Sequence, residues 1–289
     1  MTSMGSAAPS KYFSTRVAGA LAWQLENIFR AAGQWLVFIG LSFSLLPITV
    51  SKYRRQTLHQ MNSLAWGRGS LIVDGGLVSV LLILGIAVGA SLAIEAFSVL
   101  NIIGFGALSG IIAGVGAVRV IGPLVVGIAF ATQTGCRMTA EIGSMRIADE
   151  IDAVEAMGLR PVPFVVGTRL VGGLVCVVPG YLVTLVTIFF VTDAVIRVFH
   201  NQPGGTYNHY FVEFLTPTDL FYSVIKVVVY CVAVTLIHCY YGYFATGGPV
   251  GVGQASGRAV RASLVAIMIL DLTTTVMLWG FQPVFVFKG

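Results

Sequence analysis

Residues 71–94 read LIVDGGLVSVLLILGIAVGASLAI, an apolar stretch whose single charged residue is Asp74. A helix needs about 20 predominantly apolar residues to cross the roughly 30 Å hydrocarbon core of a bilayer. Because backbone polar groups find no water in lipid, such a span has to be helical. Four further blocks meet the same length criterion: 108–134, 164–191, 222–243 and 262–281. We therefore predict an all-α integral membrane protein with about five transmembrane helices in one domain.

The composition of the chain favours the same class. Of its 289 residues, 56% are hydrophobic and 10% are charged, whereas soluble domains carry about 25% charged residues. The net charge of +5 does not indicate nucleic-acid binding, because the basic residues lie at the ends of apolar blocks, where they set orientation. The opening stretch Met1–Ser14 has no apolar core of a secretory signal, so we expect the first membrane helix to direct insertion. The cysteines lack zinc-type spacing and are expected to be small buried side chains: Cys136, Cys176, Cys231 and Cys239.

The N-terminal region differs from the rest of the chain. Residues 1–33 predict a cytoplasmic amphipathic arm, and residues 34–289 the membrane domain. The apolar block 35–50 is short for a span, contains Pro47 and has basic residues on both sides. A true span would leave one of these basic flanks outside, against the positive-inside tendency. We therefore expect an interfacial or re-entrant elbow helix.

The basic residues also predict the topology. Three connecting segments, 1–70, 137–169 and 242–261, hold most of them: Lys11, Arg16, Arg30, Lys52, Arg54, Arg55, Arg68, Arg137, Arg146, Arg160, Arg169, Arg258 and Arg261. The alternate segments hold only Arg197, Lys226 and Lys288. This bias predicts a multi-pass protein of the cell (inner) membrane with a cytoplasmic N-terminus and an external C-terminus. The largest external segment, 192–221, is expected to be a loop with a short helix.

Glycines spaced four apart, as at Gly85/Gly89 and Gly106/Gly110/Gly114, let membrane helices approach closely. The pattern fits packing within the chain or an interface between subunits. The glycine-rich run 247–253 lacks the Lys-Ser/Thr pair of a phosphate-binding loop, so we expect a tight cytoplasmic turn there. Any energy used for transport would then come from another chain.

Residues 145–158 predict a short cytoplasmic helix. An apolar stripe recurs at helical spacing, and acidic residues lie towards the other side: Ile147, Ile151, Val154 and Met157 against Asp149, Asp152 and Glu155. Gly158 and the following prolines end the helix. It is either a connector on the membrane surface or a helix that docks in a protein groove. Its acidic side would be disfavoured at an anionic leaflet.

Ionisable residues inside apolar blocks are the remaining candidates for function. Arg119 and Asp271 each lie within a span, where a central charge costs about 2.5–3.5 kcal/mol on insertion scales. Each is expected to face a partner or a wet cavity. They could form a gate or a headgroup contact, or a structural polar network in which Thr273–Thr275 neighbour Asp271. Together with Gln133, they are our intramembrane candidates.

Two stretches resemble a known family. TAEIGSMRIADEIDAVEAMG (residues 139–158) closely resembles the signature of the MlaE/YrbE permeases. GYFATGGPVGVG (residues 242–253) and the later Leu270-Asp271 are similar to the final third of that family. The similarity runs from about residue 15 to the C-terminus without large insertions.

This resemblance implies a non-enzymatic permease subunit of a lipid-transporting ABC system, with an elbow helix, about five transmembrane helices and a coupling helix. The coupling helix would dock on a cytoplasmic ABC ATPase dimer, which binds ATP and Mg, while this chain binds no cofactor itself. The residues implied in coupling are Arg146, Ile147, Glu150, Ile151, Asp152, Val154, Glu155, Met157 and Gly158. Further implied partners are a second permease, MCE-domain proteins on the outer side and a lipid held between the permeases. The chain looks most like the B-type permease of actinobacterial Mce systems, which are regarded as importers of fatty acids or other lipids.

The chain also departs from the family pattern. Family members usually carry Arg-Glu-Leu-Gly-Pro where residues 119–123 read RVIGP, and Ala-Gly-Arg-x-Gly where residues 131–135 read ATQTG. An acid and a base are thus both absent, as expected if they interact, because losing one alone would strand a buried charge. Our hypothesis is a divergent member of a heteromeric permease pair. A structural anchor for the MCE assembly and an ATP-independent secondary transporter stay open as alternatives.

Overall fold

The structure is a computed structural model that describes residues 26, 29–30, 32–67, 76–200 and 204–280. Within these ranges the fold is all-α and contains no β-strand. The first half comprises α2 (Leu46–Lys52), α3 (Arg54–Trp66), α4 (Leu77–Ile102), η1 (Gly106–Leu108), α5 (Ser109–Ile111), η2 (Ile112–Ile121), α6 (Gly122–Ala129), η3 (Phe130–Gly135) and α7 (Cys136–Ile147). The second half comprises α8 (Glu150–Ala156), η4 (Pro163–Gly167), α9 (Thr168–His200), α10 (Gly204–Phe214), α11 (Pro217–Tyr243) and α12 (Gly248–Trp279).

The described residues form six helices that are long and apolar enough to cross a membrane: Ala32–Lys52, Leu77–Ile102, Ser109–Ile147, Pro163–Phe199, Pro217–Tyr243 and Gly248–Trp279. The last five contain most of the predicted spans but extend beyond them, and the all-α membrane class is confirmed. Residues 71–75 of the first predicted span lie outside the described part. The first helix is 21 residues long, which corrects the expectation of a block too short to span. Its interfacial placement stays a prediction.

The chain divides into two compact units, residues 1–44 and 45–289. In the first unit, residues 32–44 are helical. Most of the predicted amphipathic arm lies outside the described residues. The part that is described includes an exposed ion pair, in which Arg30 Nη2 lies 3.1 Å from Glu26 Oε1. The candidate site belongs to the second unit.

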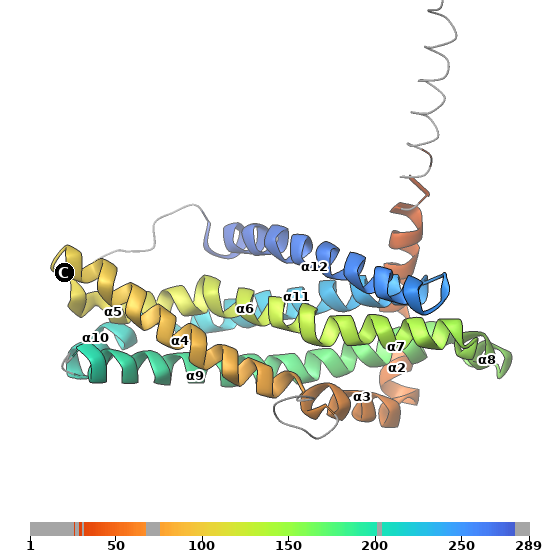
Figure 1. Cartoon of the computed structure of the whole chain (residues 1–289), viewed down its shortest axis with the longest axis horizontal. Helices are drawn as coiled ribbons and strands as arrows, with labels where there is room; N and C mark the ends of the chain where they lie inside the picture. Colours follow the sequence, from red (N-terminus) through yellow and green to blue (C-terminus); the bar gives the residue numbers. More distant parts are fainter. Residues whose placement is uncertain (1–25, 27–28, 31, 68–75, 201–203, 281–289) are drawn as a thin grey trace, which may run out of the picture. The chain divides into compact units, whose positions relative to one another are not determined.

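Helices α4 and α9 lie side by side because small residues let their backbones approach (Figure 1). A Cβ atom added at Gly89 would lie 2.9 Å from the carbonyl oxygen of Ile188, and one at Gly85 would lie 3.2 Å from Thr187 Cβ. The hydroxyl of Thr192 donates to the Gly89 carbonyl over 3.0 Å. These two glycines therefore serve packing within the chain, one of the two interpretations that the sequence left open.

The segment Ser109–Ile147 forms one continuous helical rod that is partly π-helical, in η2 and η3. A π-helical turn is wider than an α-helical one, and such turns are frequent at functional sites. Arg119 lies in η2, and the rod continues through α6 and η3 into α7. A displacement at the α7 end can therefore reach the surroundings of Arg119 through one element.

The start of α11 is fixed by a local sequence signal. The Thr216 hydroxyl accepts from the Asp219 backbone N–H over 3.2 Å, and Pro217 occupies the first turn. Both features are typical of helix N-termini. The predicted 192–221 segment is largely helical, because α9 continues to His200 and α10 follows. At the other end of α11, the turn expected at 247–253 is limited to the residues before Gly248, where α12 begins.

Candidate functional site

One face of α11 carries polar side chains into the membrane-spanning bundle. Asp219, Lys226 and Tyr230 are seven and four residues apart, so they lie on one stripe of a helix with 3.6 residues per turn. The relative exposure is 4% for Asp219 and 0% for both Lys226 and Tyr230. Such residues within spans pair with one another or line a pathway. Their partners come from η2 and α12.

Asp219 is the acceptor of a first cluster. Its Oδ1 atom lies 3.0 Å from Arg119 Nη2 and accepts from Arg119 Nε over 3.1 Å. The indole N–H of Trp279 donates to the same oxygen over 2.6 Å, and the Thr216 hydroxyl donates to Oδ2 over 2.7 Å. The Arg119 guanidinium carbon also lies 5.4 Å from the centroid of the Trp279 ring. Both carboxylate oxygens of Asp219 thus accept hydrogen bonds, although the side chain is buried.

Lys226 and Asp271 form a second cluster directly beside the first. Lys226 Nζ lies 2.7 Å from Asp271 Oδ1 and donates to the Arg119 carbonyl over 2.8 Å and to Thr275 Oγ1 over 2.9 Å. The Tyr230 hydroxyl donates to Asp271 Oδ1 over 2.6 Å. The three donors of the ammonium group therefore all have acceptors. The bond to the Arg119 carbonyl joins the two clusters.

We call these residues the intramembrane network: Arg119, Thr216, Asp219, Lys226, Tyr230, Asp271, Thr275 and Trp279. It contains two cations and two carboxylates, so its formal charge is zero. Buried ion pairs are tolerated when their charges balance and their remaining polar atoms are hydrogen-bonded. The network links η2, α11 and α12, and a change of partners within it would alter how these three elements pack.

The network brings together two of the three intramembrane residues predicted from the sequence. Arg119 and Asp271 both contact Lys226, whereas Gln133 is exposed on η3. The threonines after Asp271 do not donate to its carboxylate: Thr274 and Thr275 donate to its backbone carbonyl, and Thr273 donates to Ile269. Sequence reasoning missed Asp219, Lys226, Tyr230 and Trp279. The spacing of the first three on one helical face was the signal available.

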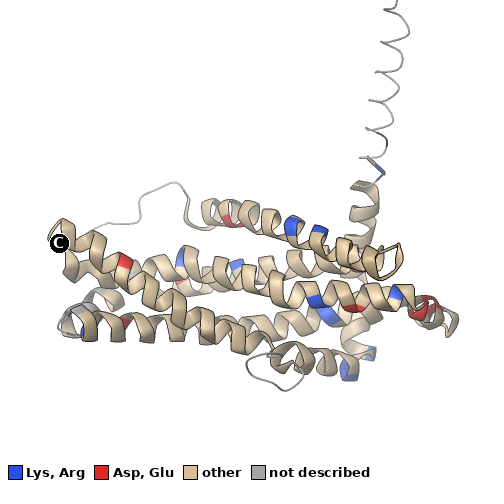
Figure 2. Cartoon of the chain, in the orientation of Figure 1, with Lys and Arg blue, Asp and Glu red and all other residues tan. Residues whose placement is uncertain are grey.

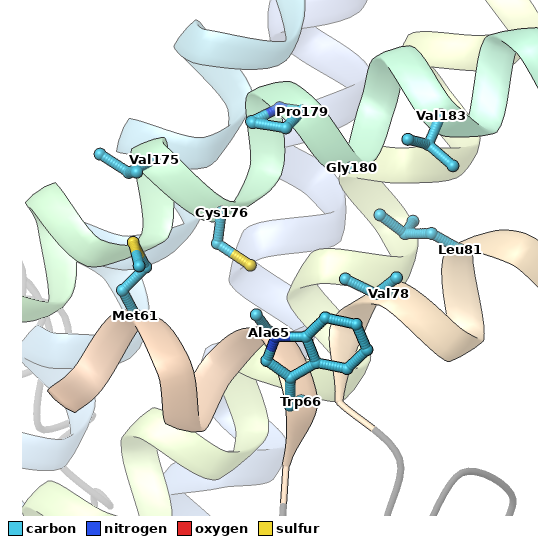
Figure 3. A pocket seen from close by; sticks show the side chains of 10 residues that line it. All are labelled: Met61, Ala65, Trp66, Val78, Leu81, Val175, Cys176, Pro179, Gly180 and Val183. Carbon is cyan, nitrogen blue, oxygen red and sulfur yellow. The ribbon is translucent and has the colours of Figure 1, made fainter. Parts of the chain in front are cut away.

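Two apolar hollows lie near the bundle. One, of about 360 Å³, opens between α4 and η2 and is lined by Ala87, Val88, Ser91, Leu92, Glu95 and Ile121. The other, of about 220 Å³, lies between α3, α4 and α9 (Figure 3), with the side chains of Trp66 and Cys176 facing it. The first shares η2 with the network, since both Ile121 and Arg119 lie on that element. Both can accommodate hydrocarbon, and Glu95 is the single charged lining residue among them.

The predicted coupling helix 145–158 is divided in two, which corrects the expectation of one continuous helix. Helix α7 ends at Ile147, Asp149 adopts a left-handed conformation with φ of 53°, and α8 then begins at Glu150. Because of this break, the four residues of the predicted apolar stripe do not share one buried face. Ile151 and Val154 are buried, but Ile147 is 40% exposed and Met157 is 68% exposed.

The acidic side of α8 faces solvent. Glu150, Asp152 and Glu155 are exposed, and Arg146 Nη1 lies 2.7 Å from Asp152 Oδ1. Figure 2 shows acidic residues gathered at this end of the bundle. Gly158 ends the segment with φ of 78°, as a left-handed C-terminal residue. The segment therefore presents acids and Met157 outwards while Ile151 and Val154 anchor it.

A third polar cluster joins α7 to the neighbouring helices α3 and α9. Glu141 lies between Arg137, at 2.9 Å, and Arg169, at 3.3 Å. Arg137 also donates to the hydroxyl and to the carbonyl of Ser63 over 2.7 and 3.1 Å. Helices α3, α7 and α9 are thereby held together near α8. Among the residues that the structure describes, no group of His, Cys, Asp and Glu could hold a metal ion.

Comparisons with known proteins place this architecture in a family. The family model described as Permease MlaE matches residues 70–277. The chain is 28% identical over 169 residues to a probable ABC transporter permease protein of Rickettsia prowazekii, covering 54% of this chain and 61% of the relative. It is 26% identical over 265 residues to the intermembrane phospholipid transport system permease protein MlaE of Haemophilus influenzae, covering 90% and 97%. The match to the Rickettsia relatives thus spans about three fifths of their length.

Proposed function

Because this chain belongs to the MlaE permease family, we propose that it is the membrane-embedded, non-enzymatic permease subunit of an ABC transporter that moves lipids. The match over residues 70–277 carries this proposal, because it includes the whole intramembrane network except Trp279. The names of two relatives, an ABC transporter permease and a phospholipid transport permease, support the same class. Fatty acids or other lipids are the proposed cargo, and import is the proposed direction.

The hollow between α4 and η2 supports a lipid cargo. Its lining is apolar except for Ser91 and Glu95, and apolar pockets with few polar groups suit hydrocarbon ligands. Large apolar side chains near the same end of α4 are exposed, including Val99 at 56% and Ile102 at 85%. We propose that an acyl chain lies along this surface, and that the network changes its contacts as the surface opens and closes.

Movement driven by ATP hydrolysis in a partner protein would be transmitted to this chain through α8. A short helix with exposed acids and a large apolar side chain can dock into a groove of another protein, and we propose a cytoplasmic ATPase dimer that binds ATP and Mg. Arg119 and Arg146 lie in the same rod, and 27 residues of helix span roughly 40 Å at 1.5 Å per residue. A rigid-body movement of α8 would be transmitted along this rod to the network.

The outer face of α12 would receive a second permease. Its exposed apolar side chains include Ile269 at 60%, Leu272 at 68% and Met277 at 79%, on the helix that carries Asp271. We propose a non-identical second permease on this face and MCE-domain proteins beyond the α10 end. In this arrangement α8 and the N-terminus are cytoplasmic, and the chain lies in the inner membrane.

Charge reversal on α8 tests the coupling role. Asp152→Lys with Glu155→Lys replaces two exposed acids, so we expect normal membrane insertion, retained basal ATPase activity and loss of at least about 90% of lipid transport, because the docking contact becomes repulsive. Transport is measured with the reconstituted complex in vesicles containing a fluorescent lipid. Asp152→Glu with Glu155→Asp keeps both negative charges on α8 and is the matched control, which should transport normally. Full transport by the α8 variant would contradict the coupling role.

Identification of the proteins that accompany the tagged chain tests the wider assembly. Purification in mild detergent should recover an ATPase with a phosphate-binding loop, a second permease and MCE-domain proteins. Recovery of the chain alone, with lipid uptake intact in cells that lack such an ATPase, would instead favour an ATP-independent transporter.

A further inference from the structure

The joint between α2 and α3 contains a polar hollow that the proposed transport cycle does not use. It measures about 470 Å³ and is lined by Lys52, Tyr53, Arg55, Gln56 and His59. Helix α2 ends at Lys52 and α3 starts at Arg54, so the lining comes from one sharp connection (Figure 1). The hollow is rich in hydrogen-bond donors and contains no carboxylate.

The positive charge of this joint is not neutralised within the described part of the protein. Lys52, Arg54 and Arg55 are exposed, and none of them takes part in the ion pairs of the described residues. Arg54 Nε donates to the Val50 carbonyl over 3.1 Å, which fixes one cation beside the joint. The first turn of α3 contains no acidic residue. An anion would therefore find cations and donors without competition from a nearby carboxylate.

The surroundings of the hollow are apolar and exposed. Val50 on α2 is 50% exposed, and Leu58 on α3 is 60% exposed. A surface that combines unpaired cations with exposed apolar side chains is typical of the region between lipid headgroups and acyl chains. A soluble anion or an acidic protein groove would account for the cations but would leave the exposed apolar side chains without a counterpart.

We propose that this hollow binds the phosphate-bearing headgroup of an anionic membrane lipid. Lys52 and Arg55 supply the charge, Gln56 and His59 supply hydrogen bonds, and the acyl chains lie against Val50 and Leu58. Arg55 suits the role because a guanidinium group can bind two phosphate oxygens at once.

The bound lipid would stabilise the connection between α2 and α3, which also contacts the segment after α8. The Thr49 hydroxyl donates to the Pro163 carbonyl over 3.1 Å, and the rings of Tyr53 and Phe164 pack edge to face with centroids 5.5 Å apart. Pro163 begins η4, which leads from the α8 region into α9. The site is separate from the intramembrane network and does not depend on the proposed transport function.

Retention of lipid by the purified protein tests the site. The full chain, within whatever complex it purifies in, is placed in nanodiscs of phosphatidylcholine mixed with anionic phosphatidylglycerol and is then analysed by native mass spectrometry. Each cation near an anionic surface contributes roughly a fivefold factor in affinity. We therefore expect Lys52→Gln with Arg55→Gln to weaken phosphatidylglycerol binding roughly 25-fold, with phosphatidylcholine binding unchanged.

A matched variant separates this site from a general effect of charge. Arg258→Gln with Arg261→Gln removes two exposed cations from α12 and should leave phosphatidylglycerol binding within about twofold of the original chain. Equal losses in both variants would overturn the proposal. Displacement of the lipid by millimolar inorganic phosphate or ATP would assign the hollow to a soluble anion and overturn the lipid assignment.

Discussion

Replacement of Lys226 by methionine is expected to lower the free energy of unfolding by about 3 kcal/mol, because it leaves the largely buried Asp271 carboxylate, 16% exposed, without a cation. Lys226 is fully buried, and the same change removes its bonds to the Arg119 carbonyl and to Thr275. The loss is measured by SDS-induced unfolding of the purified chain in mixed micelles. Arg197→Met is the control. It breaks an exposed pair with Asp193 at 2.7 Å, which should cost less than about 1 kcal/mol.

A second substitution distinguishes the lost charge balance from lost packing. Combining Lys226→Met with Asp271→Asn removes both charges and retains an oxygen acceptor for the Tyr230 hydroxyl. Because a buried pair can be replaced by neutral groups at little cost, we expect the double variant to recover most of the lost stability. A double variant as unstable as the single one would show that Lys226 acts through packing and not through its charge.

Gly89→Val is the other change with a large expected effect. The added side chain would meet the Ile188 backbone of α9, at 2.9 Å from the carbonyl oxygen and 3.1 Å from Cα. Backbone cannot move aside as a flexible side chain can, so we expect α4 and α9 to separate. Overpacking of this kind costs about 1–3 kcal/mol or more, and the loss of the Thr192 bond to the Gly89 carbonyl would add to it.

Gly257→Val provides the comparison for this prediction. Gly257 is an exposed helical glycine on α12, and an added Cβ would have no atom within 4 Å apart from the neighbouring backbone of its own helix. We expect its variant to elute as the same monodisperse species as the original chain in size-exclusion chromatography, with an unchanged thermal midpoint. If Gly89→Val behaved in the same way, the close approach of α4 and α9 would not contribute to stability.

The class of fold could be predicted from the sequence because the lengths of the apolar blocks depend on the thickness of the bilayer. The helix ends could not. Arg258 and Arg261 lie within α12, although their charge suggested a connecting segment. Gly251 and Gly253 are also helical there, although glycine favours turns. Each of these residues has helix on both sides, and that context outweighs its own preference.

Two of the four charged residues in the intramembrane network could be predicted from the sequence. Arg119 and Asp271 stand out because each is a single charge within an apolar block. Asp219 and Lys226 lie in the first half of α11, next to a predicted connecting segment, so they suggested a helix end. The burial of Asp219 depends on Arg119 and Trp279, which lie 100 and 60 residues away along the chain. The division at Asp149 was also hidden, because the stripe across it has regular spacing.

The pairing of α11 with earlier and later segments also sets an order for biogenesis. Arg119 is synthesised before Asp219, so the first ion pair can form as α11 enters the bilayer. Lys226 must wait for Asp271, which arrives with the last helix. Until then, α11 carries an uncompensated ammonium group that costs about 2.5–3.5 kcal/mol at the centre of a membrane. A chain whose synthesis stops before α12 therefore leaves this lysine without its carboxylate partner, and we expect such a chain to be retained or degraded as an immature membrane protein.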